Sequence, residues 1–230
     1  MTELRHAEVA GRRIAYRFRE GGSPTLMFLP GYASDMEGAK ALAIDTFAGE
    51  RGLAMLRLDY SGTGSSGGSF EQGTLARWLE EALGALDQLT GGPVIVIGSS
   101  MGGWIALHLA LLRPERVEAL VGVAAAPDFT DWGFSDGDAA TAQGLARGFW
   151  ESGQQLLLLD KPIGIDCPVR LLHGEMDQEV PLDVAFRLMR ALRSSDVQLN
   201  VLKGGGHRLS EPHEIRAILI ALDALLEPPS

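Results

Sequence analysis

Residues 93–112 read PVIVIGSSMGGWIALHLALL, an apolar run interrupted once by glycine and serine. The run carries no Asp, Glu, Lys or Arg and is long enough to span a membrane. However, the GSSMGG sequence at 98–103 divides it into a short stretch rich in branched residues and a following helical pattern. We therefore predict a buried strand at 94–97, a sharp turn at Ser100 and a helix at 104–112, rather than a membrane-spanning segment.

The turn at Ser100 matches the pattern G-x-S-x-G, which presents a serine oxygen between a strand and a helix. Its glycines leave room for a tight turn and for close packing of the helix on the strand. The pattern also occurs at 64–68 around Ser66, but there it is flanked by loop residues on both sides. We interpret that second match as a flexible turn and predict that Ser100 is a nucleophile.

Short apolar runs alternate with helical patterns along the rest of the chain. A hairpin around Gly11 is predicted from strands at 4–9 and 12–18. Core strands, buried on both faces, are predicted at 25–29, 54–58, 94–97, 117–124, 169–173 and 197–202, and helices at 36–51, 74–89, 104–112, 182–193 and 212–226. This alternation predicts an α/β fold with a mostly parallel central sheet of about eight strands and helices on both faces, within one domain over 1–230.

Residues 127–166 interrupt the alternation and are too long for a simple crossover between two core strands. They include the aromatic residues Phe129, Trp132, Phe134, Phe149 and Trp150 and four consecutive leucines at 156–159. These side chains either pack the segment onto the body of the protein or form a small cap insertion that lines an apolar acyl pocket over the strand ends. The two interpretations are compatible, because a cap must pack as well as bind.

A serine needs an adjacent base to become a good nucleophile. In strand–turn–helix folds of this kind, the order along the chain is serine, acid, histidine. His207 follows the last predicted strand in GGGH at 204–207, at the carboxyl edge of the sheet, and is the predicted base. His108 and His173 are interpreted as structural or surface residues, and His213 as a solvated residue in the first turn of the last helix.

The acid is expected after the preceding strand. Asp177 lies there, in HGEMD at 173–177, and is the predicted acid. Glu175 and Glu179 are neighbouring alternatives that we interpret as solvated charges. Asp128, which follows the strand at 117–124, is a further alternative for the same role.

Two backbone N–H groups are expected to stabilise the negative oxygen that forms during acyl transfer. Met101, the residue after the predicted nucleophile, supplies one. Tyr32 is the predicted second donor, through its amide rather than its phenol, from the loop LPGYASDM at 29–36. The segment DYSGTGSS at 59–66 is interpreted as a structural loop that flanks the cleft.

Four motifs taken together resemble those of a known family: 29–36, 59–66, GSSMGGW at 98–104 and RLLHG at 170–174. The chain resembles serine α/β-hydrolases, and within them the palmitoyl-protein thioesterase and acyl-glucuronide esterase branch, from about Thr25 to His207. The resemblance implies that Ser100 is the nucleophile, Asp177 the acid and His207 the base. It also implies hydrolysis of S-acyl cysteine thioesters on proteins, or of acyl glucuronides.

Composition limits the other possibilities. The chain has 230 residues, 46% of them hydrophobic, and a net charge of −10, which disfavours nucleic-acid binding. Its one cysteine, Cys167, cannot form an internal disulfide, and no Cys/His cluster has the spacing of a metal site. We expect no cofactor, no integral membrane segment, and a small-molecule or acylated-protein substrate as the partner. Because the sequence MTELRH at the start lacks an apolar segment, we expect a cytoplasmic location.

Two alternative functions stay open. The first is a general carboxylesterase that acts on small esters. The second is a hydrolase fold that has lost catalysis and serves as a binding module. The presence of all three predicted residues, Ser100, Asp177 and His207, favours an enzyme. The sequence leaves the oligomeric state open.

Overall fold

The structure is a computed structural model, and it describes residues 2–133 and 147–226. Its strands are β1 (Leu4–Val9), β2 (Arg12–Arg19), β3 (Gly22–Leu29), β4 (Leu53–Leu58), β5 (Val94–Ser99), β6 (Val117–Val123), β7 (Val169–Gly174) and β8 (Val197–Leu202). Its α-helices are α1 (Ala39–Glu50), α2 (Leu75–Leu89), α3 (Met101–Leu112), α4 (Phe129–Trp132), α5 (Arg147–Gln154), α6 (Leu182–Ala191) and α7 (Pro212–Leu226). The predicted alternation of strands and helices is confirmed.

The strands form one eight-stranded sheet in the order β1-β2-β4-β3-β5-β6-β7-β8. The opening hairpin is antiparallel, and β2 also pairs antiparallel with β4. From β4 to β8 every neighbouring pair is parallel. This arrangement confirms the predicted α/β fold class and brings the carboxyl ends of six strands to one edge.

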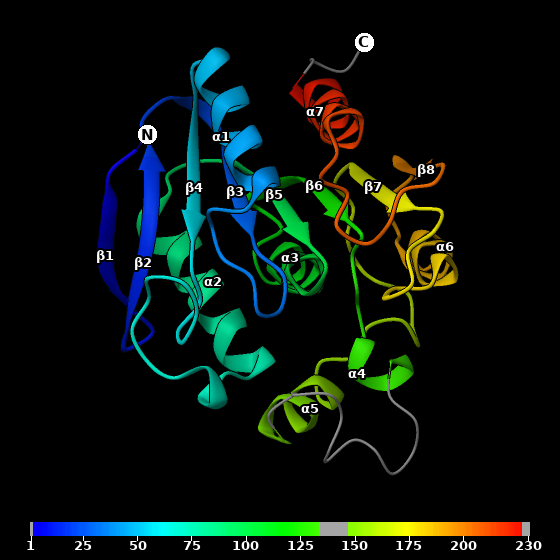
Figure 1. Cartoon of the computed structure of the whole chain (residues 1–230), viewed down its shortest axis with the longest axis horizontal. Coiled ribbons are helices and arrows are strands. Elements are labelled where there is room, and N and C mark those ends of the chain that lie inside the picture. Colours follow the sequence, from blue (N-terminus) through cyan, green and yellow to red (C-terminus); the bar gives the residue numbers. More distant parts are fainter. Residues whose placement is uncertain (1, 134–146, 227–230) are drawn as a thin grey trace.

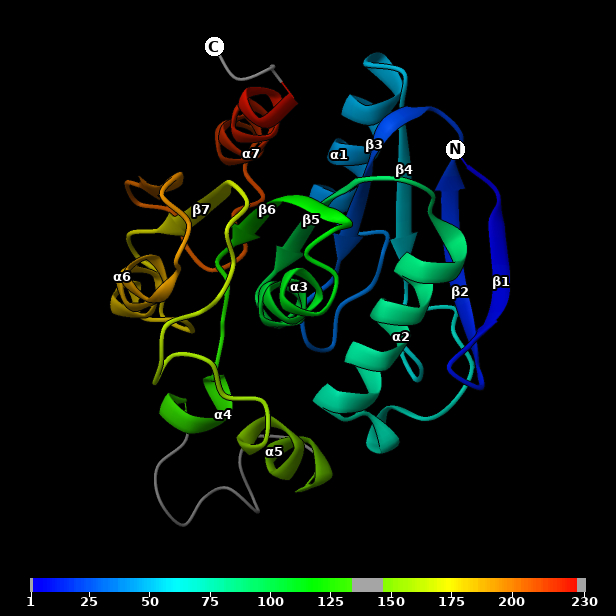
Figure 2. The same ribbon diagram turned by 180° about the vertical axis from the view of Figure 1, so that it is seen from behind.

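Helices cover both faces of this sheet, as Figures 1 and 2 show from opposite sides. On one face α1 and α7 pack against each other and on the strands, with Ile44, Phe47 and Leu222 in their shared apolar core. On the other face α2, α3 and α6 cover the sheet. The strands between these layers are apolar on both sides because neither face meets water.

The last strand departs from the prediction. β8 was expected to be a core strand buried on both faces, but it lies at the edge of the sheet and Val201 is 40% exposed. It pairs only with β7 among the described strands, and its residues Gln198, Asn200 and Val201 are exposed. The apolar residues that favoured a buried strand alternate with polar Gln198 and Asn200, which is the pattern of a half-buried strand.

The starts of two predicted helices shift by three residues each. The helix predicted from residue 36 begins at Ala39, because the Met36 amide donates to the Asp59 carboxylate, 2.8 Å away, and stays in the loop. The helix predicted from Trp104 begins at Met101, directly after Ser100. The second difference matters for the site, since it places Ser100 at the very start of α3.

The segment predicted as a cap, 127–166, lies beyond the carboxyl ends of the strands where the structure describes it (Figures 1 and 2). Phe149 of α5 is fully buried, and its ring centroid lies 5.0 Å from that of Tyr32 and 5.6 Å from that of Trp78. The segment is therefore packed onto the body through aromatic contacts. Phe134, which was named with these aromatic residues, lies outside the described residues.

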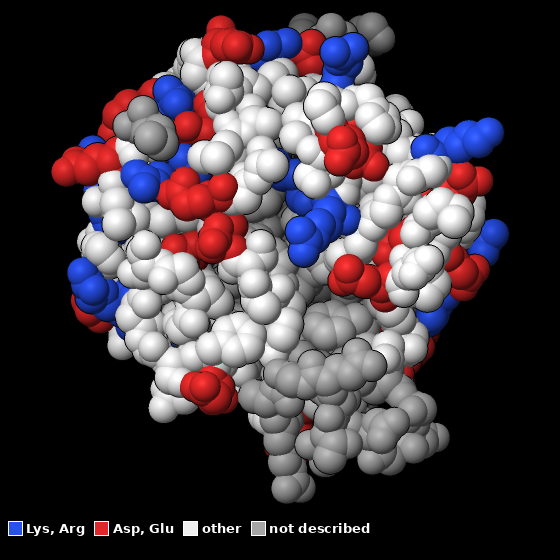
Figure 3. All heavy atoms as spheres, viewed as in Figure 1, with Lys and Arg blue, Asp and Glu red and all other residues white. Residues whose placement is uncertain are grey.

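Within residues 2–133 and 147–226, no helix combines the length and the apolar character needed to cross a bilayer. The described part of the face in Figure 3 shows acidic side chains interspersed with basic ones rather than an extended basic surface.

The close packing of α3 on β3 predicts a matched pair of stability effects. A Cβ at Gly102 would overlap the carbonyl oxygens of Leu29 and Pro30, whereas one at Gly91 would meet no atom within 4 Å. Gly102→Ala should therefore lower the free energy of unfolding by about 1–3 kcal/mol, as overpacking does. Gly91→Ala should change it by less than about 0.5 kcal/mol. Urea unfolding of the two variants measures both values, and equal effects would contradict the packing described for Gly102.

Candidate active site

Ser100 lies on a strained turn between β5 and α3. Its φ and ψ are 54° and −120°, a conformation that costs a non-glycine residue roughly 1–3 kcal/mol. Backbone hydrogen bonds hold the turn, because the Ser100 amide donates to Val123 O at 2.9 Å and the Ala126 amide donates to Ser100 O at 3.1 Å. This turn places Ser100 at the carboxyl edge of the sheet, where the residue is half-buried.

The side chains predicted as nucleophile, base and acid come together at this edge. Ser100 Oγ lies 3.1 Å from His207 Nε2, and His207 Nδ1 lies 2.9 Å from Asp177 Oδ2. Because the carboxylate only accepts, the Nδ1 nitrogen donates to it, which leaves Nε2 free to accept the serine proton in a neutral imidazole. The three side chains thus form a continuous hydrogen-bonded chain.

The carboxylate in this chain is fully enclosed. The Asp177 side chain is 0% exposed, and its Oδ1 accepts the amides of Glu179 and Val180, each at 2.9 Å. Burial alone would raise the pKa of Asp177, but the hydrogen bonds from His207 and from these amides outweigh it and the pKa lies below its ordinary value. Asp177 therefore carries its negative charge throughout the neutral range.

The loops after β7 and β8 lie in contact, and this contact brings the predicted acid and the predicted base together. A Cβ on Gly174 would overlap Gly205 O, so only glycine permits the approach. The Met176 amide donates to the same Gly205 oxygen at 2.8 Å. From the other side, Lys40 Nζ of α1 donates to Arg208 O. The loop that carries His207 is thus held from two directions.

The loop after β3 lies against the serine. A Cβ on Gly31 would be 3.3 Å from Ser100 Cβ, so the chain turns past the serine at van der Waals distance. Tyr32 follows directly, and its ring packs among aromatic residues, with Phe70 at 5.2 Å and Phe149 at 5.0 Å between centroids. Met101, the other predicted donor, is the first residue of α3, where helix amides lack an intrahelical partner. Both predicted donors therefore lie on chain segments next to Ser100.

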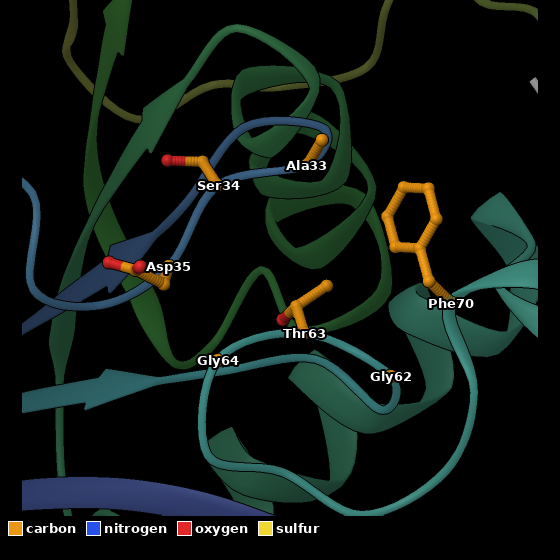
Figure 4. Close-up of a pocket in the computed structure, with 7 residues that line it drawn as sticks. All are labelled: Ala33, Ser34, Asp35, Gly62, Thr63, Gly64 and Phe70. Atoms are coloured by element: carbon orange, nitrogen blue, oxygen red, sulfur yellow. The ribbon is translucent and has the colours of Figure 1, made fainter. Parts of the chain in front are cut away.

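Asp59 fixes this loop from behind. Its carboxylate, 1% exposed, accepts the amides of Met36 and Ser65, each at 2.8 Å, and burial raises its pKa. It thereby joins the loop after β3 to the loop after β4, as expected for a structural segment flanking the cleft. A pocket of about 240 Å³ opens between the two loops, lined by residues 33–35, 62–64 and the ring of Phe70 (Figure 4).

The alternatives considered for the acid lie elsewhere or remain solvated. The carboxylate of Asp128 accepts the amides of Leu158 and Leu159 at 2.6–3.0 Å, and burial raises its pKa. Glu175 is exposed and accepts the Gly204 amide. Glu179 is also exposed, but its Oε2 lies 3.7 Å from His207 Nε2, a proximity that the sequence did not indicate.

The second G-x-S-x-G serine and the other histidines lie in hydrogen-bonded or exposed positions. Ser66 donates to Asp59 O at 2.7 Å and accepts the Ala15 amide at 2.8 Å. His108 is buried with Nε2 3.0 Å from Leu156 O, and His213 is exposed at the start of α7. His173 is buried too, but its contacts lie next to Asp177, which sequence reasoning missed. Within 2–133 and 147–226, no three or more His, Cys, Asp or Glu side chains gather to hold a metal ion.

Comparison with known proteins agrees with this fold. Residues 24–144 match the family model described as the alpha/beta hydrolase fold. The chain is 37% identical to human palmitoyl-protein thioesterase ABHD10, mitochondrial, over 93% of this chain and 76% of that protein. The chain belongs to the alpha/beta hydrolase family.

Two solved structures of this family match along the whole chain. The mouse alpha/beta hydrolase domain-containing protein 10 has a TM-score of 0.91 at 33% identity and covers 97% of this chain and 98% of its own. A putative hydrolase from Agrobacterium vitis S4 has a TM-score of 0.92 at 36% identity and covers 99% of this chain and 100% of its own. The expected resemblance to the palmitoyl-protein thioesterase branch of the alpha/beta hydrolases is thus confirmed.

The depressed pKa of Asp177 predicts a pH-dependent contribution to stability. A carboxylate whose folded pKa lies below its unfolded value of about 3.9 stabilises the fold above that pH, and the contribution is lost as the pH falls through the folded pKa. The difference in unfolding free energy between the wild type and Asp177→Asn should therefore shrink between about pH 5 and pH 2. Asp183→Asn makes the same charge change at an exposed position in α6 and serves as the control. A difference that stays constant in acid would contradict the pKa assignment.

Proposed function

We propose that the chain is a serine hydrolase that cleaves acyl thioesters or esters through an acyl-enzyme intermediate. The observation that carries the proposal is the hydrogen-bonded chain from Ser100 Oγ through His207 to Asp177, at 3.1 and 2.9 Å. Ser100 is the nucleophile, His207 the general base and acid, and Asp177 the group that orients the imidazole and stabilises its charged form. Family membership supports hydrolase activity in general, and the roles of these residues are part of the proposal.

The reaction proceeds in two steps. His207 Nε2 takes the Ser100 proton while Oγ attacks the acyl carbonyl carbon. The tetrahedral intermediate then releases a thiol or alcohol, which takes the proton from Nε2 and leaves the acyl group on Oγ. Water, deprotonated by the same imidazole, attacks the acyl-enzyme; the bond from the acyl carbon to Oγ then breaks, Nε2 returns the proton to Oγ, and the carboxylic acid is released.

The negative oxygen of each intermediate is stabilised by the amides of Tyr32 and Met101. Loss of one such donor typically costs about 3 kcal/mol of transition-state stabilisation. Support for the assignment comes from Gly31, which brings the loop within van der Waals distance of Ser100, and from the start of α3, whose dipole favours negative charge. The two donor amides are held in place before substrate binds. Asp59 anchors the loop after β3 that carries Tyr32, and Met101 is fixed as the first residue of α3.

The acyl group is proposed to lie against a small apolar cluster next to the serine. The cluster begins at Ala126, whose amide bonds Ser100 O, and continues onto α6. Its members are Ala126, Val180 and Val184, with Phe129, Trp132 and Leu159 packed against them. Because several come from 127–166, we propose that this segment is a small cap insertion in a single domain.

The substrate class follows from the chemistry and the relatives. The ABHD10 proteins are named palmitoyl-protein thioesterases, which supports an S-acyl cysteine thioester as the substrate, with acyl glucuronides as the related oxygen ester. The names of those relatives also state a mitochondrial location. The cytoplasmic location expected for this chain stays a prediction.

Replacing the nucleophile should remove activity and keep the fold. Ser100→Ala should lower kcat by about a million-fold, as removal of a triad serine does, while leaving the circular dichroism spectrum unchanged. A fluorophosphonate probe should label the wild type and leave this variant unlabelled. Ser66→Ala, at the second G-x-S-x-G match, is the control and should still be labelled. A wild type that resists labelling and hydrolyses no ester would favour the non-catalytic binding module.

The proposed acyl site predicts a chain-length preference. Each methylene buried on the apolar cluster contributes about 0.8 kcal/mol, so kcat/KM should rise roughly fourfold per methylene until the site is filled. Acetyl, octanoyl and palmitoyl thioesters of N-acetylcysteamine, beside the matching oxygen esters and an acyl glucuronide, measure the series. Val184→Thr should weaken the preference for long chains, whereas Val201→Thr, on exposed β8, should leave it unchanged. A collapse beyond acetyl would favour a general small-molecule carboxylesterase.

A further inference from the structure

A buried histidine that the proposed reaction does not use lies next to the proposed acid, Asp177. His173 is the penultimate residue of β7 and is 1% exposed. Its Nε2 lies 2.9 Å from Val180 O. Because a carbonyl oxygen only accepts, this bond requires a proton on Nε2, which fixes the tautomer of the neutral ring.

The same nitrogen faces the carboxylate of Asp177. His173 Nε2 lies 3.5 Å from Asp177 Oδ2, the oxygen that accepts from His207 Nδ1. The proton-bearing edge of one imidazole and the Nδ1–H of the other therefore converge on a single carboxylate oxygen. Both side chains, His173 and Asp177, are shielded from solvent, so this interaction is weakly screened.

Two hydrogen bonds also link the ring of His173 to the carboxylate of Asp177 through Val180. His173 holds the carbonyl of Val180, and the amide of Val180 donates to Asp177 Oδ1 at 2.9 Å. Val180 is itself buried, at 3% exposed, so its carbonyl has no solvent to replace a lost donor. The position of Val180, and through it the orientation of the carboxylate, depends on the imidazole of His173.

We propose that His173 is a positioning residue of the active site: its Nε2–H clamps Val180 O and faces Asp177, and so fixes the carboxylate that orients His207. The inference rests on the proposed function, in which Asp177 orients the base. His173 touches no reacting atom and acts only through Asp177. Among the described residues, the charged or titratable groups in contact with this unit include Asp177 itself, His207 beyond it, and Glu179, whose Oε2 lies 3.7 Å from His207 Nε2.

The chain offers a matched control. His108 is also a buried imidazole whose Nε2 faces a backbone carbonyl, Leu156 O at 3.0 Å, but it bonds the segment after α5 rather than the turn of Asp177. A purely structural role for a buried histidine predicts similar consequences for the loss of His173 and of His108. A positioning role predicts that only the loss of His173 changes the hydrogen bond from His207 Nδ1 to Asp177.

The experiment compares His173→Gln, His173→Leu and His108→Leu in the full chain. The amide nitrogen of glutamine reaches the position of Nε2 and keeps the donor, whereas leucine removes it. The first readout is the low-field proton resonance of the His207 Nδ1–H bonded to Asp177, assigned by its loss in Asp177→Asn. The second is kcat and KM on the octanoyl thioester.

We expect His173→Leu to lose or broaden the resonance and to lower kcat about 10- to 100-fold with KM little changed, as removal of an orienting hydrogen bond does. His173→Gln should keep the resonance and most of kcat, and His108→Leu should keep the resonance. If His173→Leu fails to fold, His173→Asn, whose amide is too short to reach Val180 O, takes its place with the same expected result.

Two results would overturn the inference: a resonance and kcat unchanged in the variant without a donor, or a glutamine variant as impaired as the leucine variant. The resonance is recorded without substrate. It therefore tests the role of His173 independently of whether the protein hydrolyses acyl esters. A wild type without activity on any acyl ester, but with a resonance that depends on His173 as described, would contradict the proposed function and leave the positioning of Asp177 intact.

Discussion

The close approach of α3 to the carboxyl ends of β3 and β5 is the constraint on which the site depends. Helix and strand meet backbone to backbone at Gly98 and Gly102, where a side chain would overlap carbonyl oxygens of the facing segment. This packing lets the chain turn within one residue, and Ser100 takes the strained conformation that results. The same packing places the first amides of α3 and the loop after β3 beside Ser100.

A second close approach brings the proposed base and the proposed acid together. His207 and Asp177 lie on different loops, and the two loops touch because Gly174, which has no Cβ, lets its backbone meet that of Gly205. Parallel neighbours in the sheet make this possible, since β7 and β8 end at the same edge. The proposed chemistry thus follows from three strand ends at one edge, each followed by a loop that supplies one polar side chain.

The proposed cap is held by contacts of another kind. Asp128 ends the stretch after β6 in a left-handed conformation and binds the amides of Leu158 and Leu159, which joins the two ends of the described segment. Aromatic packing of Phe149 on Tyr32 and Trp78 attaches the segment to the loop beside Ser100. A carboxylate considered as a catalytic alternative from its position after a strand therefore has a structural role, because its oxygens are already occupied.

The sequence by itself determined the fold class, the strand–turn–helix around Ser100 and the boundaries of the segments at 197–202 and 212–226, because periodicity and turn residues act over a few neighbouring positions. It also indicated which loops would carry Asp177 and His207, since parallel strands end at a common edge. Only the tertiary structure decided that β8 is an edge strand, that Asp128 holds the segment at 158–159, and that His173 lies near Asp177 and Glu179 near His207. These depend on strand order and on the path of individual loops, which bring together residues far apart in the chain through contacts that no local pattern records.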